Sequence, residues 1–158
     1  MKIAMLVLLL VIDIAFASVP PPMSCRDELA AIEAEVALIA AKHNGMPPVG
    51  TVKPRCLEDG TYAPRQCRGS VCRCVSAQGT RITEDFSIGL AYQSDCSCAR
   101  DEHDYSLLQI MGKMFFCTPI GSYHPIQCTG SVCYCVDKKG QQIGQETAHI
   151  GSQDSLKC

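Results

Sequence analysis

The sequence has little of several features on which common protein functions depend. Its 158 residues include no tryptophan, and aromatic side chains make up only 6% of them. The single asparagine, Asn44, precedes Gly45 and Met46, so the chain has no acceptor site for N-glycosylation. The formal net charge is −2, without the positive excess that is typical of proteins binding nucleic acid or anionic membranes. We therefore expect no nucleic-acid partner.

The residue patterns of enzymes and metal sites are missing as well. No Ser-His-Asp, nucleophilic cysteine or paired-carboxylate arrangement can be read from the sequence. The four histidines stand singly and away from the cysteine pairs, unlike the ligands of a zinc site: His43, His103, His124 and His149. We expect a protein that is not an enzyme, with no catalytic residue, no metal and no cofactor.

The one long apolar run lies at the N-terminus. Lys2 is followed by apolar residues 3–12, then by Asp13 and a small-residue site at Ala15 and Ala17. This order is typical of a secretory signal peptide. A membrane span needs about 20 apolar residues, and Asp13 interrupts the run too early for one. We predict that residues 1–17 are removed on export and that the mature chain is secreted and extracellular, with no membrane span.

All twelve cysteines follow residue 17, and they fall into two copies of one pattern. QCRGSVCRCV (66–75) and QCTGSVCYCV (127–136) align at an offset of 61 residues. An even cysteine count in an exported chain predicts a disulfide framework, because the export route is oxidising. The first copy contains Cys25, Cys56, Cys67, Cys72, Cys74 and Cys96, and the second contains Cys98, Cys117, Cys128, Cys133, Cys135 and Cys158. We predict domains at 18–96 and 98–158, adjoining bodies with a limited hinge at Ser97.

Each copy is too small to be stable on a hydrophobic core alone. Three disulfides per copy, each contributing about 2–4 kcal/mol, would compensate for this. Ser24 with Asp27 predicts a helix start, and Asn44 with Gly45 predicts its stop. This helix has an apolar stripe formed by Leu29, Ile32, Val36 and Ile39. We expect the stripe to pack on the core; alternatively, the helix binds a partner or a membrane. In the second copy we predict a shorter helix at about 100–111, with Tyr105, Leu108 and Met111 on its apolar side.

Short strand signals surround the C-x-C-V elements. Alternation along a strand places Cys72 and Cys74 on one face and Arg73 on the other, so these two cysteines should not bond to each other. Cys67 can instead close the small loop to Cys72, which leaves Cys74 for the distant Cys96. The sequence therefore predicts a small disulfide-rich α+β module, used twice in tandem.

Residues 52–79, VKPRCLEDGTYAPRQCRGSVCRCVSAQG, resemble a thyroglobulin type-1 domain in their P-x-C, G-x-Y, Q-C and C-x-C-V elements. The second copy is similar from Cys117 onward. There are departures: Arg73 stands where the family usually has an aromatic residue, the RGSV loop is short, and GKMFFC of the second copy lacks the P-x-C proline. The resemblance implies disulfides Cys25–Cys56, Cys67–Cys72, Cys74–Cys96, Cys98–Cys117, Cys128–Cys133 and Cys135–Cys158.

The thyropins of this family are secreted repeats that inhibit papain-like cysteine proteases with a wedge of three loops. By resemblance, the inhibitory positions of the first copy are Gly50, Thr51, Val52, Lys53, Arg68, Gly69, Ser70, Val71, Ala77, Gln78 and Gly79. We therefore expect a monomeric inhibitor whose partner is a papain-like cysteine protease. Disulfide-closed loops favour this interpretation because they lose little entropy on docking; alternatively, the glycines only shape turns.

Two other functions compete with inhibition. The same scaffold can serve as a non-inhibitory extracellular binding module, or as a venom or host-interaction factor. The two modules are not part of a larger protein in this sequence, which favours the inhibitor because there is nothing else for them to link. The short RGSV and TGSV loops count against inhibition, because a shorter loop reaches less far into a cleft. We expect the first copy to be the tighter binder because Pro54 stiffens its first loop. Its loop edge is also cationic, through Lys53, Arg55, Arg65, Arg68 and Arg73.

Overall fold

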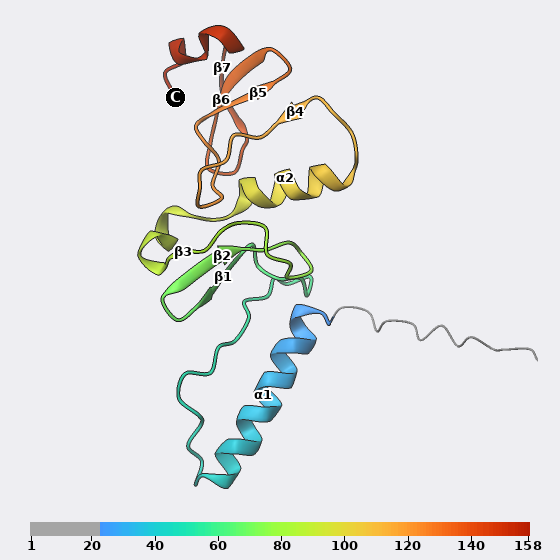
Figure 1. Cartoon of the computed structure of the whole chain (residues 1–158), viewed down its shortest axis with the longest axis vertical. Helices are drawn as coiled ribbons and strands as arrows, with labels where there is room; N and C mark the ends of the chain where they lie inside the picture. The colour runs from blue at the N-terminus through green and yellow to red at the C-terminus, as the bar shows by residue number, and fades with distance from the viewer. Residues whose placement is uncertain (1–22) are drawn as a thin grey trace, which may run out of the picture.

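The computed structural model describes residues 23–158, so the predicted signal peptide at 1–17 lies outside the described residues. Two modules follow one another along the long axis of the molecule, and α2 lies between their sheets (Figure 1). Module 1 consists of α1 (Cys25–Lys42), β1 (Arg65–Arg68), β2 (Val71–Cys74), β3 (Phe86–Ser87) and the 3₁₀ helix η1 (Ile88–Gln93). Module 2 consists of α2 (Ser97–Leu107), β4 (Lys113–Met114), β5 (Ile126–Thr129), β6 (Val132–Val136), β7 (Gln142–His149) and the 3₁₀ helix η2 (Ile150–Ser155). The predicted α+β fold of two modules is confirmed.

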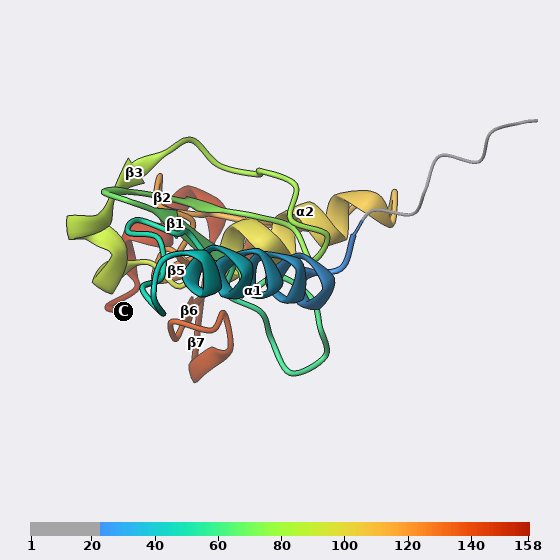
Figure 2. The same ribbon diagram turned by 90° about the horizontal axis from the view of Figure 1, so that it is seen from below.

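Helix α1 begins and ends where the capping residues predict. The Ser24 hydroxyl accepts a hydrogen bond from the Asp27 backbone N–H at 3.2 Å, and Gly45 N–H returns to the Ala40 carbonyl at 2.8 Å. The predicted apolar stripe is only half-buried, and Cys25 is the one fully buried residue of the helix. The reason is visible in Figure 1, where α1 extends away from the sheets and only the returning segment 43–55 runs beside it. Figure 2, seen from below, shows α1 in front of both sheets.

Both modules are built on the same antiparallel hairpin. In β1–β2 Cys67 pairs with Cys72, and in β5–β6 Cys128 pairs with Cys133. Cys72 and Cys74 are buried while Arg73 between them is partly exposed, as strand alternation predicts. Module 1 adds only the short β3 to this hairpin, whereas module 2 adds β4 on one side and the eight-residue β7 on the other.

The second helix differs from its prediction at both ends. It spans Ser97–Leu107 instead of about 100–111, because Gln109 adopts a left-handed conformation with φ of 54° and ends the helical path. The expected apolar side is mostly unburied: Leu108 and Met111 are exposed, and Tyr105 is partly buried against the ring of Phe115, at 5.6 Å between centroids. The buried face of α2 is formed by Cys98, Ala99 and Arg100 instead.

Six disulfides connect all twelve cysteines, three per module, in the pairs that the resemblance implies: Cys25–Cys56, Cys67–Cys72, Cys74–Cys96, Cys98–Cys117, Cys128–Cys133 and Cys135–Cys158. Most fully buried side chains are these cysteines, so sulfur does much of the packing that larger apolar residues do in bigger domains. Oxidised cysteines in this number indicate the secretory pathway. No helix in residues 23–158 is both long and apolar enough to cross a membrane.

The two modules are in direct contact beyond the Ser97 link between them. Ala99 of α2 and Ile120 belong to the same apolar cluster as Cys72, Cys74 and other core residues of module 1. The buried Arg100 side chain donates to the carbonyls of Val75, Tyr62 and Ser76 at 2.6–3.0 Å. Burial lowers the pKa of this guanidinium, and nearby acids, Asp104 first among them, oppose the shift.

Candidate functional site

One face of module 1 carries a groove of about 300 Å³ that all three predicted loop segments approach. The predicted residues that line it are Val52, Lys53, Arg68, Gln78 and Gly79, beside core-side neighbours such as Pro54, Tyr62 and Gln66. The other predicted residues lie outside its lining: Gly50, Thr51, Gly69, Ser70 and Val71 are exposed, and Ala77 is partly buried. The structure thus brings together five of the predicted positions and places the others around them.

The first segment is held in position by a side chain that the loop prediction did not include. Gln66 of β1 accepts from the Arg55 backbone N–H at 2.9 Å and donates to the Arg55 carbonyl at 2.7 Å. Lys53 is tied to α1 through an ion pair with Glu33 at 3.0 Å. Gln127 makes the same pair of bonds to Phe116 in module 2. The signal that could have found this role was the glutamine that precedes a cysteine in both copies.

The second segment is the turn between β1 and β2. The Cys67–Cys72 disulfide joins the strands beside the turn, with 4.0 Å between the Cα atoms. Gly69 has φ of 59°, a left-handed conformation that glycine adopts without steric cost. The Ser70 carbonyl accepts from Ile88 N–H at 2.8 Å, which ties the turn to η1. These constraints leave a rigid tip on which the Val71 side chain is exposed.

The third segment is a turn fixed from both sides. The Ser76 hydroxyl accepts from the backbone N–H groups of Gln78 and Thr80, both at 3.2 Å. Gly79 lies against the Tyr62 ring, since a Cβ atom at Gly79 would fall 2.9 Å from it. The Tyr62 hydroxyl in turn donates to Glu28 of α1. Burial and this acceptor raise the pKa of Tyr62 to about 12.

The five cations of the predicted edge do not form one surface. Lys53, Arg68 and Arg73 line the groove, and Arg73 is paired with Asp85 at 3.0 Å. Arg55 and Arg65 line a separate cleft between the modules. The division follows from the fold, because the Arg65 guanidinium donates to the carbonyls of Ala91 and Ser94, toward η1 and the junction.

The family model for the thyroglobulin type-1 repeat matches residues 25–89 and 114–158. The chain belongs to the thyroglobulin type-1 repeat family. It is 34% identical to thyroglobulin of Bos taurus over 120 residues, which are 72% of this chain and 4% of that protein.

Two further relatives show how widely the repeat is used. Equistatin of Actinia equina is 31% identical over 120 residues, 67% of this chain and 49% of equistatin. The H-2 class II histocompatibility antigen gamma chain of Rattus norvegicus is 38% identical over 73 residues, 42% of this chain and 25% of that protein. The chain thus spans only a small part of thyroglobulin and about half of equistatin.

Proposed function

We propose that this protein is a secreted, monomeric inhibitor of papain-like cysteine proteases. In this proposal residues 1–17 are a cleaved signal peptide, and 18–96 and 98–158 are the two domains. The inhibitory surface is the edge of module 1 around the groove, formed by residues 50–53, 68–71 and 77–79. Family membership supports the proposal, because the thyropins that the chain resembles occlude a protease cleft with three loops.

The observation that carries the proposal is the convergence of three chain segments on one groove. Val52, Arg68 and Gln78 come from separate parts of module 1 and line it together. Each segment is fixed independently: the first by Gln66, the second by the Cys67–Cys72 disulfide, the third by Ser76. Loops that are already ordered lose little entropy when they dock, so more of the contact energy is retained as affinity.

The test is a titration of the refolded chain, residues 18–158 with six disulfides, against papain-like, trypsin-like and aspartic proteases. We expect inhibition of the papain-like enzymes alone. Val71→Asp should raise the inhibition constant about tenfold or more, because it places a charge on an apolar contact. The matched variant Val132→Asp, at the equivalent exposed position of the β5–β6 turn, should leave it within about twofold, as is usual for a residue outside the contact.

Two outcomes would overturn parts of this proposal. A larger effect of Val132→Asp than of Val71→Asp would move the inhibitory edge to module 2. Absence of inhibition with every protease would favour the second candidate, an extracellular binding module without inhibitory action. One observation favours that candidate: only Gly69 and Ser70 separate β1 from β2, and a tip this short reaches less far into a cleft.

A further inference from the structure

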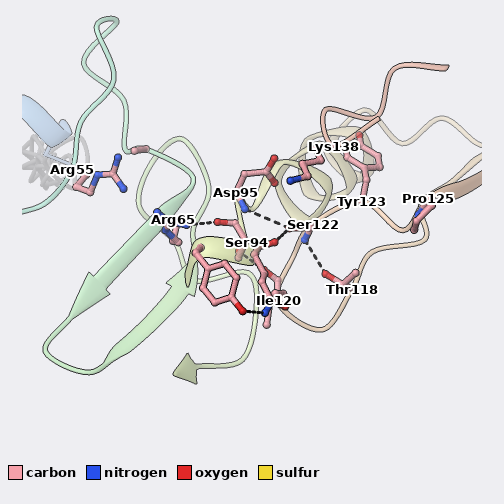
Figure 3. Close-up of a pocket in the computed structure, with 13 residues that line it drawn as sticks. Arg55, Arg65, Ser94, Asp95, Thr118, Ile120, Ser122, Tyr123, Pro125 and Lys138 are labelled. Atoms are coloured by element: carbon pink, nitrogen blue, oxygen red, sulfur yellow. Dashed lines mark hydrogen bonds between the residues drawn. The ribbon is translucent and has the colours of Figure 1, made fainter. Parts of the chain in front are cut away.

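A cleft of about 630 Å³ lies between the modules, and it shares no lining residue with the groove of module 1. Figure 3 shows side chains from both modules along it, with Arg55 and Arg65 from module 1 and Lys138, Tyr123 and Pro125 from module 2. The cleft therefore exists only in the two-module chain, and neither copy alone would form it.

The junction beneath the cleft is ordered by hydrogen bonds that cross between the modules. The Ser94 hydroxyl donates to the Ile120 carbonyl at 2.6 Å, and the Ser122 hydroxyl donates to the Gln93 carbonyl at 2.9 Å. Asp95 N–H donates back to the Ser122 oxygen at 3.4 Å. With these bonds in place the walls are fixed before any ligand arrives, which lowers the entropic cost of binding.

The charges along the cleft are unbalanced in favour of cations. Three cationic side chains line it, Arg55, Arg65 and Lys138, against a single acid, Asp95. None of the ion pairs in residues 23–158 includes any of these three cations. The Asp95 carboxylate is already engaged, because its Oδ1 accepts from both the backbone N–H and the hydroxyl of Ser97. An excess of unpaired positive charge in a protein with net charge −2 marks a place for an anionic ligand.

Arg65 adds an unmet hydrogen bond to this unpaired charge. Its Nη1 donates to the carbonyls of Ala91 and Ser94. Its Nε is buried and has no acceptor, the one such side-chain atom found in the described part of the chain. An unpaired buried donor is unfavourable, and this one belongs to a guanidinium group that lines the cleft.

The cleft also has apolar and aromatic walls, beside the polar Gln93, Thr118 and Ser122. Ile120, Pro125 and Ala63 contribute apolar surface, and the Tyr92 side chain, 82% exposed, stands at the rim. A sulfated glycan offers charge without apolar groups, whereas a peptide offers both. We propose that the cleft binds an acidic segment of a partner protein, with Arg55, Arg65 and Lys138 receiving its carboxylates and the apolar walls receiving neighbouring side chains.

The experiment uses the refolded chain, residues 18–158, labelled with ¹⁵N, and follows the Nε–H resonances of arginine. The probe is the peptide acetyl-Glu-Leu-Asp-Leu-Glu-amide, and its uncharged control is acetyl-Gln-Leu-Asn-Leu-Gln-amide. We expect the acidic peptide to shift the Arg55 and Arg65 resonances in a saturable way, with a dissociation constant of about 0.1–1 mM. The uncharged peptide should bind at least about fivefold more weakly, because the carboxylates make the decisive contacts.

Exposed residues provide the variants, since Arg65 also supports the fold. Arg55→Gln and Lys138→Gln should each weaken binding about threefold to tenfold, and more salt should reduce the difference. Lys139→Gln is the matched control, because Lys139 is the exposed neighbour of Lys138 and does not line the cleft. Lys138→Gln should leave protease inhibition unchanged, so the outcome of this test is separate from that of the proposed function.

Four results would overturn the assignment, three of them comparisons and the last an absence of binding. The first is equal binding of the acidic and uncharged peptides, and the second is an equal loss on Lys138→Gln and Lys139→Gln. The third is a heparin tetrasaccharide that shifts the same arginines and binds more tightly than the acidic peptide, which would assign the cleft to a glycan. Absence of any saturable shift up to about 5 mM peptide would show that the cleft takes no acidic segment.

Discussion

The two modules share a backbone but differ in the charge of their surfaces. At the five cationic positions of module 1, module 2 has no charge: Lys53, Arg55, Arg65, Arg68 and Arg73 correspond to Met114, Phe116, Ile126, Thr129 and Tyr134. The hairpin registers are nevertheless the same in both modules. The residues that recur include those that set the backbone, namely the cysteines, the turn glycines and the glutamine before the third cysteine, and also the exposed tip valines Val71 and Val132. The difference teaches that the charge of the surface is specified by other residues than those that set the backbone.

The first segments differ in backbone as well. In module 2 Lys113–Met114 joins the sheet as β4, and Gly130 N–H donates to the Gly112 carbonyl at 3.2 Å. In module 1 the equivalent segment forms no strand and is tied to α1 by Lys53. The longer gap between the first two cysteines of module 1 allows this, because it includes the full length of α1. Module 2 consequently presents an apolar tip, with Ile110 and Met111 exposed.

The junction makes the modules unequal in a third respect. Gly121 of module 2 lies against the core of module 1, and a Cβ atom there would fall 2.4 Å from the Cys74 sulfur. The equivalent Gly60 faces only the Arg26 side chain, at 3.6 Å. Arg100 is buried against module 1 and stands two residues after Cys98, the first cysteine of its copy. The residue two positions after Cys25, the first cysteine of the other copy, is the exposed Asp27. Module 2 is therefore fitted to module 1, whereas no such contact occupies the equivalent face of module 1.

The largest expected effect comes from comparing the two glycines. Gly60→Ala should lower the free energy of unfolding by about 1–2 kcal/mol, because φ of 89° strains any residue with a Cβ atom. Gly121→Ala has the same strain and also overpacks against Cys74, so about 3–5 kcal/mol is expected. Denaturant unfolding of the oxidised chain measures both. An equal decrease in the free energy of unfolding for both variants would show that Gly121 is not closely packed against Cys74.

The second comparison weakens the junction by removing one of its polar contacts, that of Arg100. Arg100→Ala leaves the carbonyls of Val75 and Tyr62 without this donor, so a loss of about 3 kcal/mol is expected. Asp27→Ala, at the equivalent position of module 1, removes an exposed first-turn acid and should cost less than about 1 kcal/mol. Denaturant unfolding again provides the measurement. In addition, Arg100→Ala should increase amide hydrogen exchange at Ser76 more than at Asp137 of module 2, and a uniform increase would contradict a local role.

The sequence predicted those parts of this picture that depend on local pattern. The caps of α1 and the alternation of Cys72 and Cys74 follow from neighbouring residues, and the structure agrees with them. The end of α2 was missed because Gln109 gives no local signal of a left-handed conformation. The burial of Arg100 could not be predicted, since a charged residue near a helix start is usually exposed and its three acceptors are 24–38 residues away. The separation of the five cations into two surfaces could not be predicted either, because it depends on where η1 and the junction between the modules lie.

Each module has a tyrosine that lies against a turn glycine, Tyr62 against Gly79 and Tyr123 against Gly140, and the two offer a third comparison. Burial and Glu28 raise the pKa of Tyr62 from 10.0 to about 12, and greater burial with Asp101 raises that of Tyr123 further. Because the folded value exceeds the unfolded one, the stability from Tyr62 is complete below about pH 10 and lost as the pH rises towards 12. Tyrosinate absorbance, measured after rapid pH jumps to a series of final pH values, should show Tyr62 ionising at a lower pH than Tyr123. The variants Tyr62→Phe and Tyr123→Phe assign each step. Ionisation of Tyr123 first, or of either near pH 10, would contradict the contacts described.

The smallest effect tests whether the charge difference between the modules affects binding. Arg68 and Thr129 occupy equivalent exposed positions at the ends of β1 and β5. If module 1 carries the inhibitory edge, Arg68→Thr should slow association with an acidic papain-like protease about threefold and accelerate association with a basic one. Dissociation should change little, because an exposed charge at the rim contributes less than about 1 kcal/mol to the bound state. Thr129→Arg should leave both rates unchanged, since module 2 would then lie away from the contact.

Stopped-flow measurements at low and high ionic strength separate these cases: the Arg68→Thr effect should fade with added salt. An equal and opposite effect of Thr129→Arg would mean that the protease contacts both modules, and that neither edge alone determines the encounter.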